Sequence, residues 1–246
     1  MKIKHLLCFI ALCLFFTPGK AQQLSVMTLR NGATVYIWED KSKPDVFGMI
    51  AFKVGSVDDP EQYTGLAHYL EHVMFKGTQT IDALDWEKEK PIYEKIIAKY
   101  DERAALSDPA AREAVDKEIN DLTREAAQYA AGNEFSLLVD HMGGQGLNAS
   151  TGYDQTEYHN SFPPSQLEKW LEIYSERLID PVFRGFQTEL EAVYEEYNMY
   201  NDDRGSRMRE FIYEQAFGDH PYARPIIGLP EHLKNPQLSK LIDFYN

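Results

Sequence analysis

Two histidines and a glutamate in one short run are the residues of this chain that are best suited to bind a metal ion or to catalyse a reaction. The segment Gly65–Phe75 has apolar residues at helical spacing and contains His68, Glu71 and His72. On a helix, His68 and His72 share one face because they are four residues apart, and their imidazole nitrogens can bind one metal ion. Glu71 lies at the edge of that face and can reach a metal-bound water without being a ligand. The pattern predicts a zinc site for hydrolysis with Glu71 as the catalytic general base. The alternative is a surface helix with two unrelated histidines.

A third ligand is expected from an acidic residue elsewhere, because catalytic zinc sites have three protein ligands and one open position. A helix expected near residues 187–200 carries four glutamates. Glu189 and Glu196 are seven residues apart, nearly two full turns, and therefore share a face. Glu191 and Glu195 point elsewhere. Geometry alone leaves both Glu189 and Glu196 as candidate ligands.

The elements that must position these residues predict an α+β fold, because strands and helices come in mixed clusters along the chain. Asn31-Gly32 between two apolar runs predicts a β-hairpin, since both residues tolerate positive φ. Val46–Val54 is expected to form a largely buried strand. Leu147–Phe162 alternates like a pair of strands bent near Gly152.

Residues from about 86 to 132 differ in composition from the rest of the chain. Lys, Glu, Asp and Ala dominate, with apolar residues at helical spacing. Asp108 as a cap and Pro109 at the first helical position predict the start of a second helix, and Gly132 its end. We therefore expect a helical hairpin inserted into the fold. A partner-binding arm or a lid is conceivable, but a solvated excursion is the simpler interpretation.

The first residues have the three-part layout of a secretory signal peptide. Lys2 and Lys4 precede an apolar run from Leu6 to Phe16, and small residues follow up to Ala21. The run is too short to span a bilayer as a helix. Removal of residues 1–21 predicts an exported protein, periplasmic or extracellular, without a membrane anchor.

The composition excludes cysteine-based chemistry and disfavours some classes of partner. Cys8 and Cys13 both lie in the signal segment, so residues 22–246 have no cysteine for disulfides, thiol catalysis or Cys-bound zinc. The chain has 25 basic and 39 acidic residues, and losing the three lysines of the signal segment leaves a net charge of about −17. Such a charge disfavours nucleic acid and anionic membranes as partners.

Several motifs follow one another as in the pitrilysin/insulinase-type zinc metallopeptidases, the inverzincins with the order His-x-x-Glu-His, and the chain resembles that family. The matching runs are Gly55-Ser56, His68 to His72 with Phe75 to Thr78, Gly143-Gly144 with Asn148 to Thr151, and Glu189 to Glu196. The resemblance extends from about Leu24 to the end of the chain and is interrupted by the helical insertion.

The resemblance assigns roles that spacing alone leaves open. It implies that Glu196 is the third ligand of one zinc ion per chain and that Glu189 supports the site through a ligand. Asn148 and Ala149 resemble the edge strand on which such enzymes bind an extended peptide substrate by β-augmentation.

The family's fold is also implied. It is a processing-peptidase-like metallohydrolase half, with a mixed, mostly antiparallel sheet and helices packed on one face. Residues 22–246 would be the N-terminal peptidase domain, incomplete at its C-terminus. A second homologous half-domain or subunit is then an expected partner.

The sequence predicts an exported zinc metalloendopeptidase that hydrolyses peptide bonds in peptides or unfolded polypeptides. The resemblance puts activity of the chain alone in question, because members of the family usually take an Arg and a Tyr near the scissile bond from a second half, which this sequence does not cover. The alternative is a non-catalytic partner or scaffold subunit of a peptidase assembly, but such subunits lose motif residues and this chain keeps them. Zinc-dependent chemistry on a small molecule is a third possibility, which the predicted peptide-binding strand disfavours.

Overall fold

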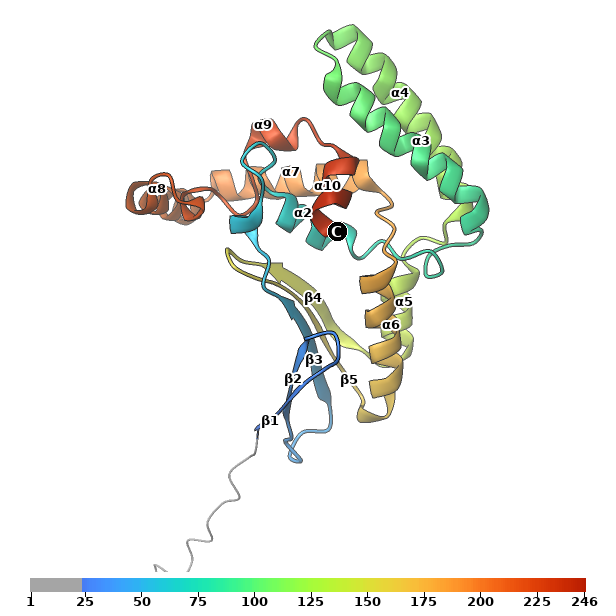
Figure 1. Cartoon of the computed structure of the whole chain (residues 1–246), viewed down its shortest axis with the longest axis vertical. Helices are drawn as coiled ribbons and strands as arrows, with labels where there is room; N and C mark the ends of the chain where they lie inside the picture. The colour runs from blue at the N-terminus through green and yellow to red at the C-terminus, as the bar shows by residue number, and fades with distance from the viewer. Residues whose placement is uncertain (1–23) are drawn as a thin grey trace, which may run out of the picture. The chain divides into compact units, whose positions relative to one another are not determined.

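The structure is a computed structural model that describes residues 24–246. The expected signal peptide, residues 1–21, lies outside the described residues. The chain divides into two compact units, residues 1–44 and 45–246, which are described separately (Figure 1).

The described part of the first unit is a β-hairpin. Strands β1 (Leu24–Thr28) and β2 (Thr34–Trp38) pair antiparallel. Gly32 has a φ of 87°, and the side chain of Asn31 accepts a hydrogen bond from the backbone N–H of Ala33 at 3.1 Å. The hairpin expected from Asn31-Gly32 is confirmed.

The second unit contains a three-stranded antiparallel sheet with the order β3-β5-β4. Its strands are β3 (Val46–Phe52), β4 (Gln145–Thr151) and β5 (Thr156–Phe162). The bent strand pair is confirmed, but the expectation of a largely buried β3 is wrong. Only Gly48 of that strand is buried. Because β3 is at an edge of this sheet and alternate residues point to its outer face, an apolar run here does not require burial.

Helices of the second unit pack on one face of this sheet. Along β5 every second residue, from Thr156 to Phe162, is buried. Helix α6 (Leu167–Ile179) covers this face, where Trp170 stacks on Phe162 with ring centroids 5.2 Å apart. The indole N–H of Trp170 donates to Oδ1 of the buried Asn160 at 2.7 Å. On the opposite face Phe47, paired with Ser161, is 60% exposed. The α+β architecture with helices on one face is confirmed.

The second unit contains further helices. Helix α2 (Leu66–Val73) contacts β4 and also α7 (Phe186–Asp202), which is followed at once by α8 (Arg204–Phe217). The other helices outside the insertion are α5 (Glu134–His141), α9 (Pro230–Leu233) and α10 (Leu238–Tyr245). None of the helices between residues 24 and 246 is both long and apolar enough to cross a membrane.

The predicted helical hairpin is present and projects away from the sheet (Figure 1). It consists of α3 (Trp86–Ala105) and α4 (Pro109–Ala126), and the carboxylate of Asp108 caps α4 by accepting from the N–H of Ala111 at 2.9 Å. The helix ends at Ala126, before Gly132, and a 3-10 turn follows. The hairpin is more than a solvated excursion, because its inner face joins the core and Tyr100 contacts Phe186 with ring centroids 4.7 Å apart.

Candidate metal centre

Helix α2 places the two histidines because its opposite side is packed into the core. Ala67, Tyr69 and Val73 are buried, and the ring of Tyr69 lies 4.9 Å from that of Phe186 at the start of α7. Helix α2 therefore packs directly on the helix that carries the predicted acidic ligand. The remaining side of α2 presents His68 and Glu71 to a pocket.

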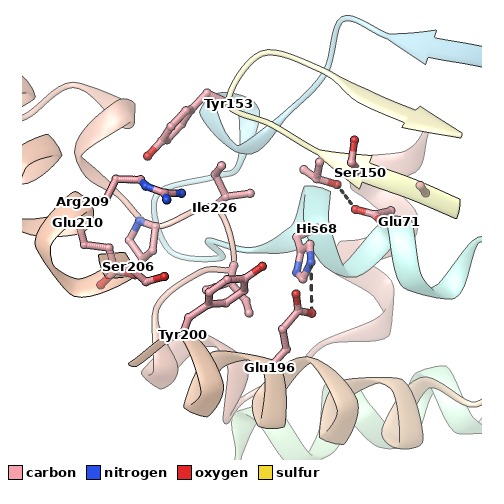
Figure 2. A pocket seen from close by; sticks show the side chains of 14 residues that line it. His68, Glu71, Ser150, Tyr153, Glu196, Tyr200, Ser206, Arg209, Glu210 and Ile226 are labelled. Atoms are coloured by element: carbon pink, nitrogen blue, oxygen red, sulfur yellow. Dashed lines mark hydrogen bonds and ion pairs between the residues drawn. The ribbon is translucent and has the colours of Figure 1, made fainter. Parts of the chain in front are cut away.

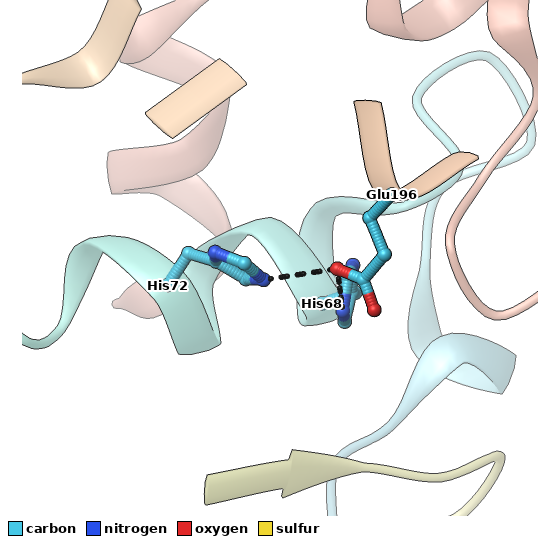
Figure 3. A group of neighbouring side chains, drawn as sticks. All are labelled: His68, His72 and Glu196. Atoms are coloured by element: carbon cyan, nitrogen blue, oxygen red, sulfur yellow. Dashed lines mark ion pairs between the residues drawn. The ribbon is translucent and has the colours of Figure 1, made fainter. Parts of the chain in front are cut away.

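His68, His72 and Glu196 converge on one point (Figure 3). Oε2 of Glu196 lies 3.6 Å from Nε2 of His68 and 3.5 Å from Nε2 of His72. All three ligand atoms lie within 4.8 Å of one another. Two neighbours on α2 and one residue far along the chain thus form a compact group of two imidazoles and one carboxylate.

This donor set fits zinc in chemistry and in spacing. Zinc bonds of about 2.0–2.2 Å in a tetrahedral arrangement place neighbouring ligand atoms about 3.3–3.6 Å apart. The two separations from Glu196, 3.6 and 3.5 Å, agree with that spacing. Both histidines offer Nε2, and three protein ligands leave one position open, as in catalytic zinc sites.

Glu189 lies behind His72 and does not join the group of three. Its Oε2 is 3.5 Å from Nδ1 of His72, on the ring edge that faces away from Glu196. Its other oxygen lies 2.5 Å from Nζ of Lys76. The two glutamates that spacing could not separate therefore have different positions, Glu196 at the ligand face and Glu189 behind a ligand.

The other nitrogen of His68 has no such support. Nδ1 of His68 is buried and has no hydrogen-bond partner among the described residues. The two histidines of the group are thus held differently, His72 by a carboxylate on its far edge and His68 by the surrounding packing and its backbone.

Glu71 lies beside the group, where a general base would be placed (Figure 2). Oγ1 of Thr151, the last residue of β4, donates to Oε2 of Glu71 at 2.6 Å. Burial raises the pKa of Glu71, while the Thr151 hydrogen bond and the charge of His72 lower it and the charge of Glu196 raises it. The net pKa of Glu71 is above its ordinary value, which favours proton uptake close to neutral pH.

The histidines have opposite pKa shifts. Burial and the neighbouring His72 lower the pKa of His68 to about 4, so its ring is neutral and can act as a ligand at neutral pH. Burial lowers the pKa of His72, but hydrogen bonds to Glu189 and Glu196 and the charge of Glu71 outweigh it and raise the value to about 9. The hydrogen bond with His72 lowers the pKa of both Glu189 and Glu196.

A pocket of about 300 Å³ opens over this site between α2, β4, α8 and the segment 225–227. Figure 2 shows Arg209 and Tyr153 on the side of the pocket away from His68 and Glu196. Arg209 makes no ion pair within residues 24–246. The lining residues are His68, Glu71, Ala149, Ser150, Thr151, Tyr153, Glu196, Tyr200, Ser206, Arg209, Glu210, Pro225, Ile226 and Ile227.

The two predicted substrate-binding residues lie on β4, the second edge strand of the sheet. Ala149 pairs with Tyr158 of β5 and lines the pocket, whereas Asn148 is exposed and does not line it. The outer edge of β4 has no partner strand in the described part of the chain. The structure thus brings Ala149 to the site and leaves Asn148 at its margin.

Sequence reasoning missed two residues that act on the predicted ones. Thr151 lies in the Asn148–Thr151 run, but no local spacing indicates that its hydroxyl reaches Glu71, 80 positions away. Asp59 reaches α2 through backbone groups and belongs to no side-chain pattern.

Comparisons with known proteins agree on one family. The sequence model of the insulinase family, peptidase family M16, matches residues 34–90 and 119–229. The interval between the matched stretches falls within the α3–α4 hairpin.

Curated relatives are similar at low identity. An uncharacterized zinc protease of Mycobacterium leprae is 25% identical over 194 residues, which are 78% of this chain and 32% of that protein. The zinc protease PqqE of Helicobacter pylori is 25% identical over 224 residues, 89% of this chain and 39% of that protein. The chain thus spans only about a third to two fifths of the length of these relatives.

Solved structures share the fold. A protease from Helicobacter pylori has a TM-score of 0.67 at 22% identity, covering 92% of this chain and 43% of its own. Pitrilysin has a TM-score of 0.63 at 22% identity, covering 93% of this chain and 20% of its own. The similarity of architecture therefore covers nearly all of this chain and less than half of either structure.

Proposed function

This chain belongs to the insulinase family, peptidase family M16, and we propose that it is the catalytic half of an exported zinc metalloendopeptidase. It hydrolyses peptide bonds in peptides or unfolded polypeptides. The observation that carries the proposal is the convergence of His68, His72 and Glu196, with Glu71 in the pocket that His68 and Glu196 also line.

His68, His72 and Glu196 would hold one zinc ion through two imidazole nitrogens and a carboxylate oxygen. When bound, zinc supplies Lewis-acid polarisation of the scissile carbonyl and lowers the pKa of a coordinated water. Glu189 orients the ring of His72 by accepting its Nδ1–H, and Lys76 holds Glu189 in place.

Glu71 moves the proton. Its raised pKa favours uptake of a proton from the attacking water and its return to the leaving amine. The hydroxyl of Thr151 holds one oxygen of this carboxylate by donating a hydrogen bond to Oε2. Burial of the site strengthens these charge interactions, because water screens them less.

The substrate lies along the free outer edge of β4. An extended peptide can add there as a further strand, with its backbone bonded to the strand and its side chains entering the pocket. Ala149 lies where such a strand passes the site, and Asn148 extends the edge beyond it.

A second homologous half is the proposed partner, as the short coverage of the relatives supports. Export rests on the layout of residues 1–21, and it places the enzyme in the periplasm or outside the cell.

A non-catalytic scaffold subunit is the competing function. The complete donor set and the raised pKa of Glu71 support catalysis, because a scaffold needs neither.

Zinc content and peptide cleavage test the proposal together. The parent chain should hold about one zinc ion, and Glu196→Gln much less, since a carboxamide is a poor zinc ligand. Glu195→Gln, the exposed neighbour on α7, is the matched control and should behave like the parent. Glu71→Gln should keep its zinc and abolish cleavage in the assembled enzyme. Full cleavage by Glu71→Gln, or equal zinc in all variants, would refute the assignment.

A further inference from the structure

The start of helix α2 is capped by a buried carboxylate from outside the helix. Oδ2 of Asp59 accepts from the N–H of Gly65 at 2.7 Å, and Oδ1 accepts from the N–H of Ala67 at 2.8 Å. Asp59 is only 5% exposed. One side chain thus satisfies two of the backbone donors that the first turn of a helix leaves without an intrahelical partner.

Helix α2 has no other side-chain cap. Its N-cap residue, Gly65, has a φ of 88° and no side chain that could accept a hydrogen bond. Without Asp59 the first turn of this eight-residue helix would have no acceptor for those donors. The negative charge of Asp59 also interacts favourably with the positive end of the helix dipole.

A segment near the end of the chain contacts the loop that carries Asp59. Arg224 Nη2 donates to the carbonyl oxygen of Asp59 at 3.4 Å. Thr64 Oγ1 lies 2.8 Å from Nδ1 of His232, and the N–H of Leu229 donates to the same oxygen at 2.9 Å. The segment 224–232 therefore fixes the loop that presents Asp59.

His68 depends on this cap more than His72 does. His68 is the third residue of α2, so its backbone belongs to the capped turn. Its Nδ1 has no hydrogen-bond partner among residues 24–246, whereas Nδ1 of His72 lies 3.5 Å from Oε2 of Glu189. The place of the His68 ring is therefore set by its packing and by the backbone that Asp59 holds.

We infer that Asp59 is a positioning residue for the metal centre, which sets the place of His68 by fixing the first turn of α2. The inference rests on the proposed zinc site. Asp59 does not touch the metal or the substrate in this role. It acts through the backbone of Gly65 and Ala67.

Zinc affinity and the visible spectrum of the cobalt-substituted chain test this role. Asp59→Ala should weaken zinc binding about 10- to 100-fold, the range found when groups that support metal ligands are removed. Asp59→Asn keeps one acceptor oxygen and should lie between the parent and Asp59→Ala. The d–d bands of bound Co²⁺ should shift in both variants, because they report ligand geometry. A loss of stability alone would not move them.

Asp58→Ala is the matched control. Asp58 lies in the same loop, but its carboxylate accepts a hydrogen bond from the N–H of Gly55 at 2.9 Å and does not reach α2. This variant should keep the zinc affinity and the cobalt spectrum of the parent. Circular dichroism establishes which variants are folded, and Asp59→Asn carries the test if Asp59→Ala does not fold.

The outcomes separate the two proposals. A folded Asp59 variant with the zinc affinity and cobalt spectrum of the parent would overturn the positioning role and leave the zinc site intact. An equal loss in Asp58→Ala would also overturn it. A parent chain that binds neither metal would overturn the zinc site, and the positioning role with it.

Discussion

Oε2 of Glu189 lies 3.5 Å from Nδ1 of His72, on the edge of the ring opposite to Glu196. A neutral His72 that binds a metal through Nε2 must carry its proton on Nδ1, and Glu189 is placed to accept it. The contact selects the tautomer that exposes Nε2 to the metal. His68 has no corresponding acceptor among the described residues, so the two ligands are controlled by different means.

Glu189→Gln should therefore weaken zinc binding without removing a ligand. We expect an affinity about 10- to 100-fold lower, since the amide holds His72 without a charge. Competition with a chelating dye measures the change, and Glu195→Gln on the same helix is the control. A larger effect for Glu189→Gln than for Glu196→Gln would exchange the roles of the two glutamates.

Thr151→Val should reduce cleavage while zinc content stays the same. The substitution removes the hydrogen bond to Glu71 and keeps the shape of the side chain. That hydrogen bond lowers the pKa of Glu71, so its loss should move the acid limb of the rate profile to higher pH. Thr151→Ser keeps the hydroxyl and should retain the parent profile. An unchanged profile for Thr151→Val would show that the contact does not act on the base.

Stability should depend on pH through Asp59. Burial raises the pKa of Asp59 from 3.8 to about 6, and the charge of Asp58 adds to the rise. The hydrogen bonds from Ala67 and Gly65 and the charge of Arg224 lower this pKa but do not outweigh burial. Between about pH 4 and 6 the folded chain binds more protons at Asp59 than the unfolded chain, so stability falls as pH rises. The shift corresponds to about 3 kcal/mol.

Urea unfolding of the metal-free chain at several pH values measures this effect. In Asp59→Asn the fall in the free energy of unfolding between about pH 4 and 6 should be smaller by about 3 kcal/mol. The variant also loses one hydrogen bond, but it does so at every pH. Identical slopes in parent and variant would contradict the raised pKa of Asp59.

Arg209 should favour peptides with an acidic side chain near the cleaved bond. It lines the pocket without an ion pair in the described part of the chain, and a substrate carboxylate can pair with its guanidinium. Arg209→Ala should raise KM for an acidic peptide more than for its amide analogue, by about fivefold at most for an exposed pair. Arg207→Ala is the control, because Arg207 is on the same helix and does not line the pocket. Equal effects on both peptides would exclude this contact.

Much of the site could be predicted from sequence because its members lie on helices. Periodicity places His68 and His72 on one face of α2, and the same argument places Glu189 and Glu196 on one face of α7. Geometry along one helix does not say which glutamate meets the Nε2 atoms of the two histidines and which lies behind His72. The packing of Tyr69 on Phe186 sets that relation, and it depends on contacts between segments far apart in the chain.

Other features could not be predicted for related reasons. Asp59 and Thr151 act across turns and strands, where no fixed period relates partners. The hairpin at Asn31-Gly32 was predictable because the turn chemistry is local. The burial of β3 was predicted wrongly, because strand burial depends on neighbours that the run itself does not specify.

The two ends of the α3–α4 hairpin lie next to each other. Ala83 and Ala130 form an isolated antiparallel bridge, and the N–H of Leu84 donates to the carbonyl oxygen of Tyr129 at 2.8 Å. With its ends joined in this way, the excursion behaves as a closed loop, and the entropy of closing a loop grows only slowly with its length. The outer tip of this arm, beyond the Tyr100–Phe186 contact, can therefore change in length while α2 and α7 keep their places, which separates the size of the protein from the geometry of its chemistry.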